Sequence, residues 1–156
     1  MSYYRPIIFP VILYGAETLS PTRQLARNLD AFDQWCLRRI LGISWMDRIS
    51  NEEVRRRTDQ PPLTDIIRIT RLKYFGQIAR ANTSMNHSRA LRASVAPLPR
   101  DWNRRAGRPR LTWLRTVESD LAPFNIGLAT AYHRAQNRQA WSKLVRTATF
   151  SSGQAT

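Results

Sequence analysis

The chain has 156 residues, 42% of them hydrophobic and 10% aromatic, so it can bury a core without disulfides or metals. Its single cysteine, Cys36, excludes an internal disulfide and favours a reducing, intracellular (nuclear or cytoplasmic) location over secretion. The longest apolar run, residues 7–14, is much shorter than the roughly 20 residues of a membrane helix, so no membrane contact is expected.

Charge is the strongest overall signal. The net charge is +14, from 25 basic and 11 acidic residues, and all basic residues except Lys73 and Lys143 are arginines. The planar guanidinium matches phosphate geometry and stacks on bases, so this composition favours RNA and DNA as partners through backbone contacts. The alternative is an ordinary solvated surface in an arginine-rich protein.

The first element, residues 1–19, is apolar around Ile7–Tyr14 and is compatible with a buried strand or with a short helix. Apolar side chains at the start of the chain are expected to pack against another part of a folded protein. Either an upstream domain supplies that cover, or the segment is the buried first element of a complete domain.

Residues 20–42 predict the best-formed helix, with Ser20 as its cap, Pro21 at its first position and Gly42 as its end. Apolar side chains follow at spacings of three and four and predict a buried stripe: Leu25, Leu29, Phe32, Cys36 and Ile40. Arg38 faces away from this stripe, and Arg39 lies at its margin.

Two further helices are expected before residue 82. Ser50 and Glu53 have the spacing of a capping box and begin a short basic helix over residues 50–59. Thr64 predicts the start of a long helix over residues 64–81. Its wide apolar arc indicates a central position, and Gly76 within it suits the close approach of another helix.

The second half begins with a change of composition. Residues 82–110 are rich in Pro, Gly and Arg and predict a basic connector with a short helical patch over residues 89–95. Helices are then expected over residues 111–122 and 130–146, followed by a frayed tail. The class is therefore all-α: a multi-helix bundle with a thumb-like helical region at 1–81, a connector at 82–110, a C-terminal helical pair at 111–146 and a disordered tail at 147–156.

Sites for chemistry are sparse. The histidines and the cysteine lack the spacing of zinc ligands, and no glycine-rich phosphate loop occurs, so no metal, cofactor or catalytic residue is assigned. Asp30 and Asp33 lie on one helical side without a third ligand nearby. Cys36 is expected in the core rather than as a nucleophile.

A set of short motifs, in order, carries a family resemblance. Residues 14–18 (YGAET), 35–42 (WCLRRILG), 45–54 (WMDRISNEEV), 71–76 (RLKYFG) and 107–110 (GRPR), with Trp113, Arg138 and Trp141 after them, resemble the region that follows the polymerase palm in non-LTR retrotransposon reverse transcriptases. Three positions, Leu19, Gln77 and Asn137, depart from that family's usual residues, as in a truncated or decaying copy.

The resemblance implies a thumb and C-terminal extension that grips template RNA and the primer–template duplex. The family's polymerase centre, an RNA-directed DNA polymerase, lies in a palm motif that this chain lacks, so whether the chain is an enzyme stays open. The phosphate contacts expected under this hypothesis are Arg38, Arg39, Arg104, Arg105, Arg108 and Arg110. The alternative is an interaction fragment that self-associates or packs on a missing palm domain, without a nucleic-acid role.

Overall fold

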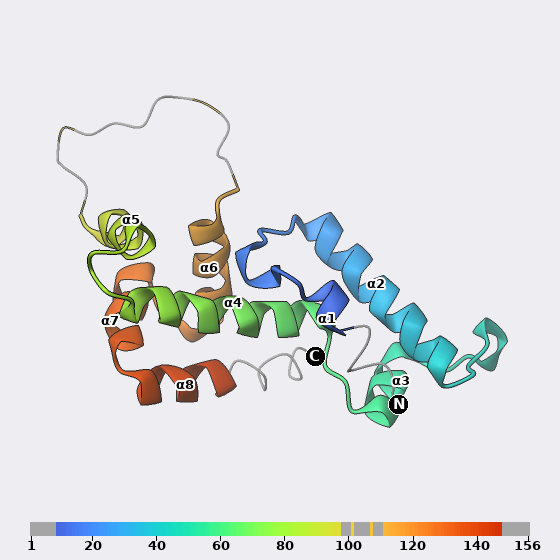
Figure 1. The fold of residues 1–156 in the computed structure, drawn as a ribbon. Coiled ribbons are helices and arrows are strands. Elements are labelled where there is room, and N and C mark those ends of the chain that lie inside the picture. Colours follow the sequence, from blue (N-terminus) through green and yellow to red (C-terminus); the bar gives the residue numbers. More distant parts are fainter. Residues whose placement is uncertain (1–8, 98–100, 102–106, 108–110, 148–156) are drawn as a thin grey trace. The chain divides into compact units, whose positions relative to one another are not determined.

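The computed structural model describes residues 9–97, 101, 107 and 111–147, and every regular element within these ranges is helical (Figure 1). The α-helices are α1 (Phe9–Ile12), α2 (Arg23–Ile40), α3 (Asn51–Thr58), α4 (Leu63–Arg80), α5 (Asn86–Val95), α6 (Trp113–Leu121), α7 (Leu128–Gln136) and α8 (Arg138–Thr147). Short 3₁₀ turns are η2 (Ala16–Thr18), η3 (Trp45–Asp47) and η4 (Ala122–Phe124). The predicted all-α class is confirmed.

The chain forms two compact units, Met1–Arg68 and Ile69–Thr156, and the boundary falls inside α4. This division differs from the predicted boundaries after residues 81 and 110, because residues 69–80 of α4 cluster with the C-terminal helices. Of the predicted connector, residues 86–95 form α5, so the expected helical patch is present. Most of its arginine-rich second half lies outside the described residues.

Helix α2 begins two residues later than predicted. Thr22, not Ser20, is its cap, because the Thr22 hydroxyl accepts the backbone N–H of Leu25 at 3.2 Å. At the other end Gly42 has φ +66°, a left-handed backbone that glycine adopts without strain, so the predicted end is confirmed.

The predicted core stripe of α2 is largely wrong. Cys36 is buried and Leu29 is partly buried, but the side chains of Leu25, Phe32 and Ile40 are 47%, 48% and 41% exposed. The buried face of α2 consists of Asp33, Gln34, Cys36 and Leu37. The helix is therefore turned so that polar residues face inward.

Two acids of α2 explain this orientation. Asp33 is buried and forms an ion pair with Arg55 of α3 at 2.9 Å. The Asp30 carboxylate accepts the Thr64 backbone N–H at 3.1 Å and the Thr64 hydroxyl at 2.7 Å, so it caps α4 at its positive end. Thr64 was predicted to be the cap, but its N–H and hydroxyl groups instead donate hydrogen bonds to the Asp30 carboxylate. One ion pair and one carboxylate cap thus favour burial of the acid-bearing face of α2.

The cap of α3 is confirmed, since the Ser50 hydroxyl accepts the Glu53 backbone N–H at 3.2 Å. The second bond of a capping box, from the Ser50 backbone N–H to the Glu53 carboxylate, is not among the described contacts. The Glu53 carboxylate instead accepts hydrogen bonds from Arg56 and Arg57, both at 2.7 Å. These bonds, Arg56 first, lower the pKa of Glu53 to about 2. The three consecutive arginines of α3 are therefore engaged within the unit.

The second unit is built around α4. Leu72, Phe75, Ile78 and Ala79 of α4 are buried in one cluster with residues of α5, α6, α7 and α8, which confirms the central role predicted for this helix. Arg71 on the same helix is 3% exposed and holds Asp120 of α6 through two bonds of 2.6 and 3.1 Å.

The last predicted helix, residues 130–146, is two helices. Asn137 adopts an extended backbone (φ −89°, ψ 105°) between α7 and α8. Its side-chain oxygen accepts the backbone N–H groups of Gln139 and Ala140 at 3.0 and 3.1 Å. Asparagine is a favoured residue at the start of a helix, so Asn137 ends α7 and caps α8. The expected helical pair is therefore three helices, α6, α7 and α8.

Two phenylalanines test the corrected core. Phe75→Ala is expected to lower the free energy of unfolding by about 3–5 kcal/mol, because Phe75 is fully buried. Phe32→Ala should lower it by less than about 1 kcal/mol, because this side chain is half exposed. Urea denaturation followed by circular dichroism measures both. A loss of several kcal/mol for Phe32→Ala would show that this face of α2 is covered in the folded protein.

Candidate nucleic-acid interface

Of the six arginines predicted to contact phosphate, the structure describes two. Arg38 and Arg39 lie in the last turn of α2, where their charges complement the negative end of the helix dipole. The other four, Arg104, Arg105, Arg108 and Arg110, lie outside the described residues.

Arg38 and Arg39 have different surroundings. The Arg38 guanidinium donates to the Ile49 carbonyl and, at 3.1 Å, to the Asn51 side chain, so it joins the end of α2 to the start of α3. Arg39 is exposed. Both line a shallow groove of about 650 Å³ in the first unit, together with Trp35, Gly42, Ile43 and Ser44.

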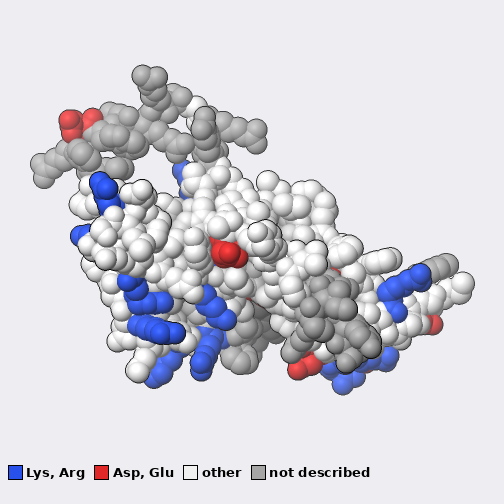
Figure 2. All heavy atoms as spheres, viewed as in Figure 1, with Lys and Arg blue, Asp and Glu red and all other residues white. Residues whose placement is uncertain are grey.

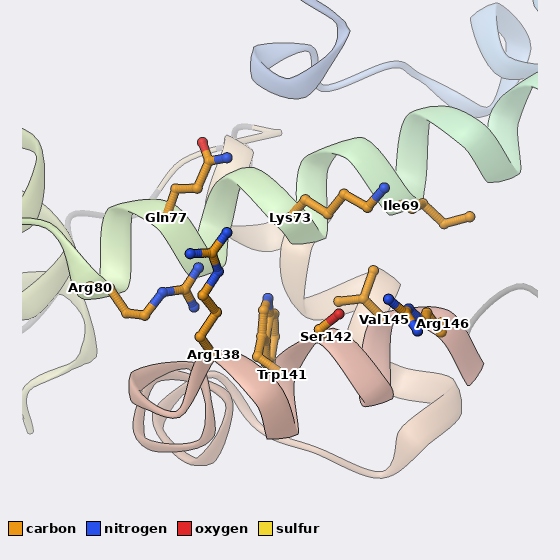
Figure 3. Close-up of a pocket in the computed structure, with 9 residues that line it drawn as sticks. All are labelled: Ile69, Lys73, Gln77, Arg80, Arg138, Trp141, Ser142, Val145 and Arg146. Carbon is orange, nitrogen blue, oxygen red and sulfur yellow. The ribbon is translucent and has the colours of Figure 1, made fainter.

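A second groove, here called the basic groove, lies between α4 and α8 of the second unit (Figure 3). Its volume is about 760 Å³. Its lining combines cations, amide and hydroxyl groups and an apolar floor: Ile69, Lys73, Gln77, Arg80, Arg138, Trp141, Ser142, Val145 and Arg146.

Four of the lining residues are cations, and none of the lining residues that the structure describes is acidic. Figure 2 shows Lys and Arg side chains gathered over this part of the second unit. A groove lined by charges of one sign focuses the electric field and attracts polyanions. The arrangement therefore suits phosphate groups along a nucleic-acid backbone.

Arg80 and Arg138 form the densest positive point of the basic groove, where their side chains extend toward one another from α4 and α8 (Figure 3). Partial burial and then the Arg138 charge lower the pKa of Arg80. The Arg80 guanidinium also donates to the Ala135 carbonyl at 2.7 Å, which holds it in place. A guanidinium stays charged in proteins, so two positive charges are held close together and an anion between them would relieve their repulsion.

The basic groove was not predicted from the sequence, although the spacing of polar residues on α4 and α8 indicates two polar helix faces. Lys73, Gln77 and Arg80 recur at spacings of four and three, so they share one face of α4. Arg138, Ser142 and Arg146 recur every four residues along α8. What the sequence does not reveal is that these two polar faces meet, because that depends on how α8 docks on α4.

The docking of α8 depends on Gly76. The Trp141 indole N–H donates to the Leu72 carbonyl at 2.9 Å, and the indole lies against the α4 backbone at Gly76. A Cβ at position 76 would lie only 2.5 Å from Trp141 Cδ1. The close approach predicted at Gly76 is confirmed, and it sets the floor of the basic groove.

The described residues contain no group of three or more His, Cys, Asp or Glu side chains placed to hold a metal ion. Burial, followed by the Asp33 charge, raises the pKa of the Cys36 thiol, which keeps it protonated and unreactive. In the described part of the chain, no helix has the length and apolar content required to span a membrane.

Comparisons with protein-family models, with curated proteins and with solved structures gave no significant match.

Gly76→Ala is expected to destabilise the second unit by about 1–3 kcal/mol. Alanine would favour the helix by roughly 1 kcal/mol, but it would displace a Trp141 ring that is 3% exposed and break its bond to Leu72. Thermal and urea unfolding measure the change. Gly127→Ala is a control for steric clash alone, because nothing lies within 4 Å of its added Cβ; any loss there reflects a weaker cap of α7. Equal stability of Gly76→Ala and wild type would contradict this packing.

Proposed function

We propose that this chain binds nucleic acid through its phosphate backbone and is the catalytically incomplete C-terminal region of a non-LTR retrotransposon reverse transcriptase. The observation that carries the binding proposal is the basic groove, whose lining includes Lys73, Arg80 and Arg138 and, among the described residues, no acidic one. The net charge of +14 supports it.

The geometry of the groove suits backbone contacts more than base reading. Trp141 at its floor is buried against α4, so its ring face is not free to stack on a base. Lys73, Gln77 and Arg138 are exposed and offer donors at its rim. Donors of this kind bind phosphate oxygens in any sequence, which predicts binding without strong sequence preference.

The family proposal has separate support. It comes from the ordered motifs between residues 14 and 141 and from the helical fold, which is compatible with a thumb and its C-terminal extension. Template RNA and primer–template duplex are then the proposed partners, and a nuclear or cytoplasmic location follows. No polymerase step is assigned, because the palm motif is absent from the sequence. An in-frame palm motif in the DNA upstream would test this assignment.

A second candidate function is an interaction fragment that packs on a palm domain or on itself. Exposed apolar side chains of the first unit favour it, since Val11, Tyr14 and Leu19 are 75%, 90% and 44% exposed. Burying such groups against a partner is the usual way to remove them from water.

The binding proposal is tested by titrating single-stranded RNA and an RNA–DNA hybrid at several salt concentrations. Affinity should fall with salt, with a log–log slope of roughly −0.7 to −0.9 per neutralised phosphate. The double variant Lys73→Gln/Arg138→Gln should bind more weakly, and its slope should be less negative by roughly one unit per replaced cation.

Lys143→Gln is the matched control for this titration. Lys143 is exposed on α8 but does not line the basic groove, so its replacement should change affinity much less. Salt-independent affinity, or no binding at low salt, would overturn the proposal. Salt-independent self-association in a light-scattering concentration series would favour the interaction fragment.

A further inference from the structure

The face of α2 that was expected in the core carries two exposed aromatic rings. Phe32 and Trp35 are 48% and 60% exposed, and their rings stack with centroids 6.2 Å apart and an interplanar angle of 26°. Exposed apolar side chains that lie together, rather than singly, often mark a binding site, and here two rings lie side by side on one helix.

Two arginines lie near Trp35. Arg39 lies four residues after Trp35, on the same side of α2, and is exposed. Trp35, Arg38 and Arg39 line one groove, and none of its described lining residues is acidic. Gly42 in the same lining has open space beside it, since nothing lies within 4 Å of a Cβ built there.

We propose that Trp35, supported by Phe32, stacks an unpaired base while Arg39 contacts a neighbouring phosphate. This face is then a platform for single-stranded nucleic acid. The inference rests on the proposed function and adds to it a substrate class, because the basic groove binds backbone of any kind. Aromatic rings beside cations are the usual means of holding single strands without sequence preference.

The same features favour single strands over a duplex. Within a duplex each base is stacked on its neighbours, so its ring face is not available to Trp35. An unpaired base presents that face at no such cost. Duplex contacts are therefore expected at the basic groove rather than at the Trp35 platform.

The size of this face also argues against a protein partner. The exposed polar Asn28 separates the two rings from Leu25, and Arg39 bounds them at the other end. Specific protein interfaces bury roughly 800 Å² per partner. Two adjacent rings present an area closer to that of a single base than to that of such an interface.

Fluorescence anisotropy with three labelled probes of equal length tests the platform: a single-stranded oligonucleotide, the same backbone with abasic sites throughout, and a duplex. Trp35→Ala should weaken binding of the single strand at least about fivefold. It should change binding of the abasic strand and of the duplex less than about twofold, because these probes keep phosphates but offer no free base.

Two variants serve as controls. Trp35→Phe keeps an aromatic face, so it should retain single-strand affinity within about threefold. Leu25→Ala removes a similarly exposed apolar side chain from the same helix and should leave all three affinities unchanged. Circular dichroism of each variant verifies that α2 stays folded, as expected for replacements at exposed positions.

These measurements distinguish failure of the Trp35 platform from failure of the proposed nucleic-acid binding. If wild type binds all probes with salt dependence and Trp35→Ala binds the single strand equally well, the platform is overturned and the basic groove stands. Equal weakening on all three probes would also overturn the platform. If wild type binds no probe at low salt, the proposed function fails with it. If Trp35→Ala abolishes self-association and leaves nucleic-acid binding intact, the face belongs to a protein contact and the platform is overturned.

Discussion

The contact on which the second unit depends is that of the Trp141 indole with the backbone of α4. It requires a residue without a side chain at position 76, and it is fixed by the bond from the indole to the Leu72 carbonyl at 2.9 Å. The same ring packs against Phe75, with centroids 5.6 Å apart. Because α8 is docked in this way, the polar edges of α4 and α8 face each other and form the basic groove.

In the first unit, two carboxylates have the corresponding role. Asp30 caps α4 and Asp33 pairs with Arg55, so the face of α2 that carries these acids is turned inward. The opposite face, with Phe32 and Trp35, is then left in water beside Arg39. In both units, acids neutralise internal arginines: Asp33 pairs with Arg55, and Asp120 pairs with Arg71. None of the described residues that line the two grooves is acidic.

Sequence patterns predicted the structure correctly where the interaction involves only residues close together in the chain. The cap at Ser50, the left-handed backbone at Gly42 and the wide apolar arc of α4 depend on neighbours in sequence, and all three are present. The predicted stripe of α2 is largely exposed, because apolar periodicity does not reveal the hydrogen bonds of Asp30 to Thr64 or the ion pair of Asp33 with Arg55. The break at Asn137 was missed, because residues on both sides of it continue a helical pattern.

The sequence by itself determined the helical class, most helix positions and the excess of arginine, and it contains the motifs on which the family proposal rests. Only the tertiary structure decided which side chains face water and which cations lie together. Arg38 is bound to the Ile49 carbonyl, whereas Arg80 and Arg138, far apart in sequence, share one groove. The physical reason is that burial and charge clustering depend on the rotation and docking of each helix, and buried ion pairs and a single close contact at Gly76 set both.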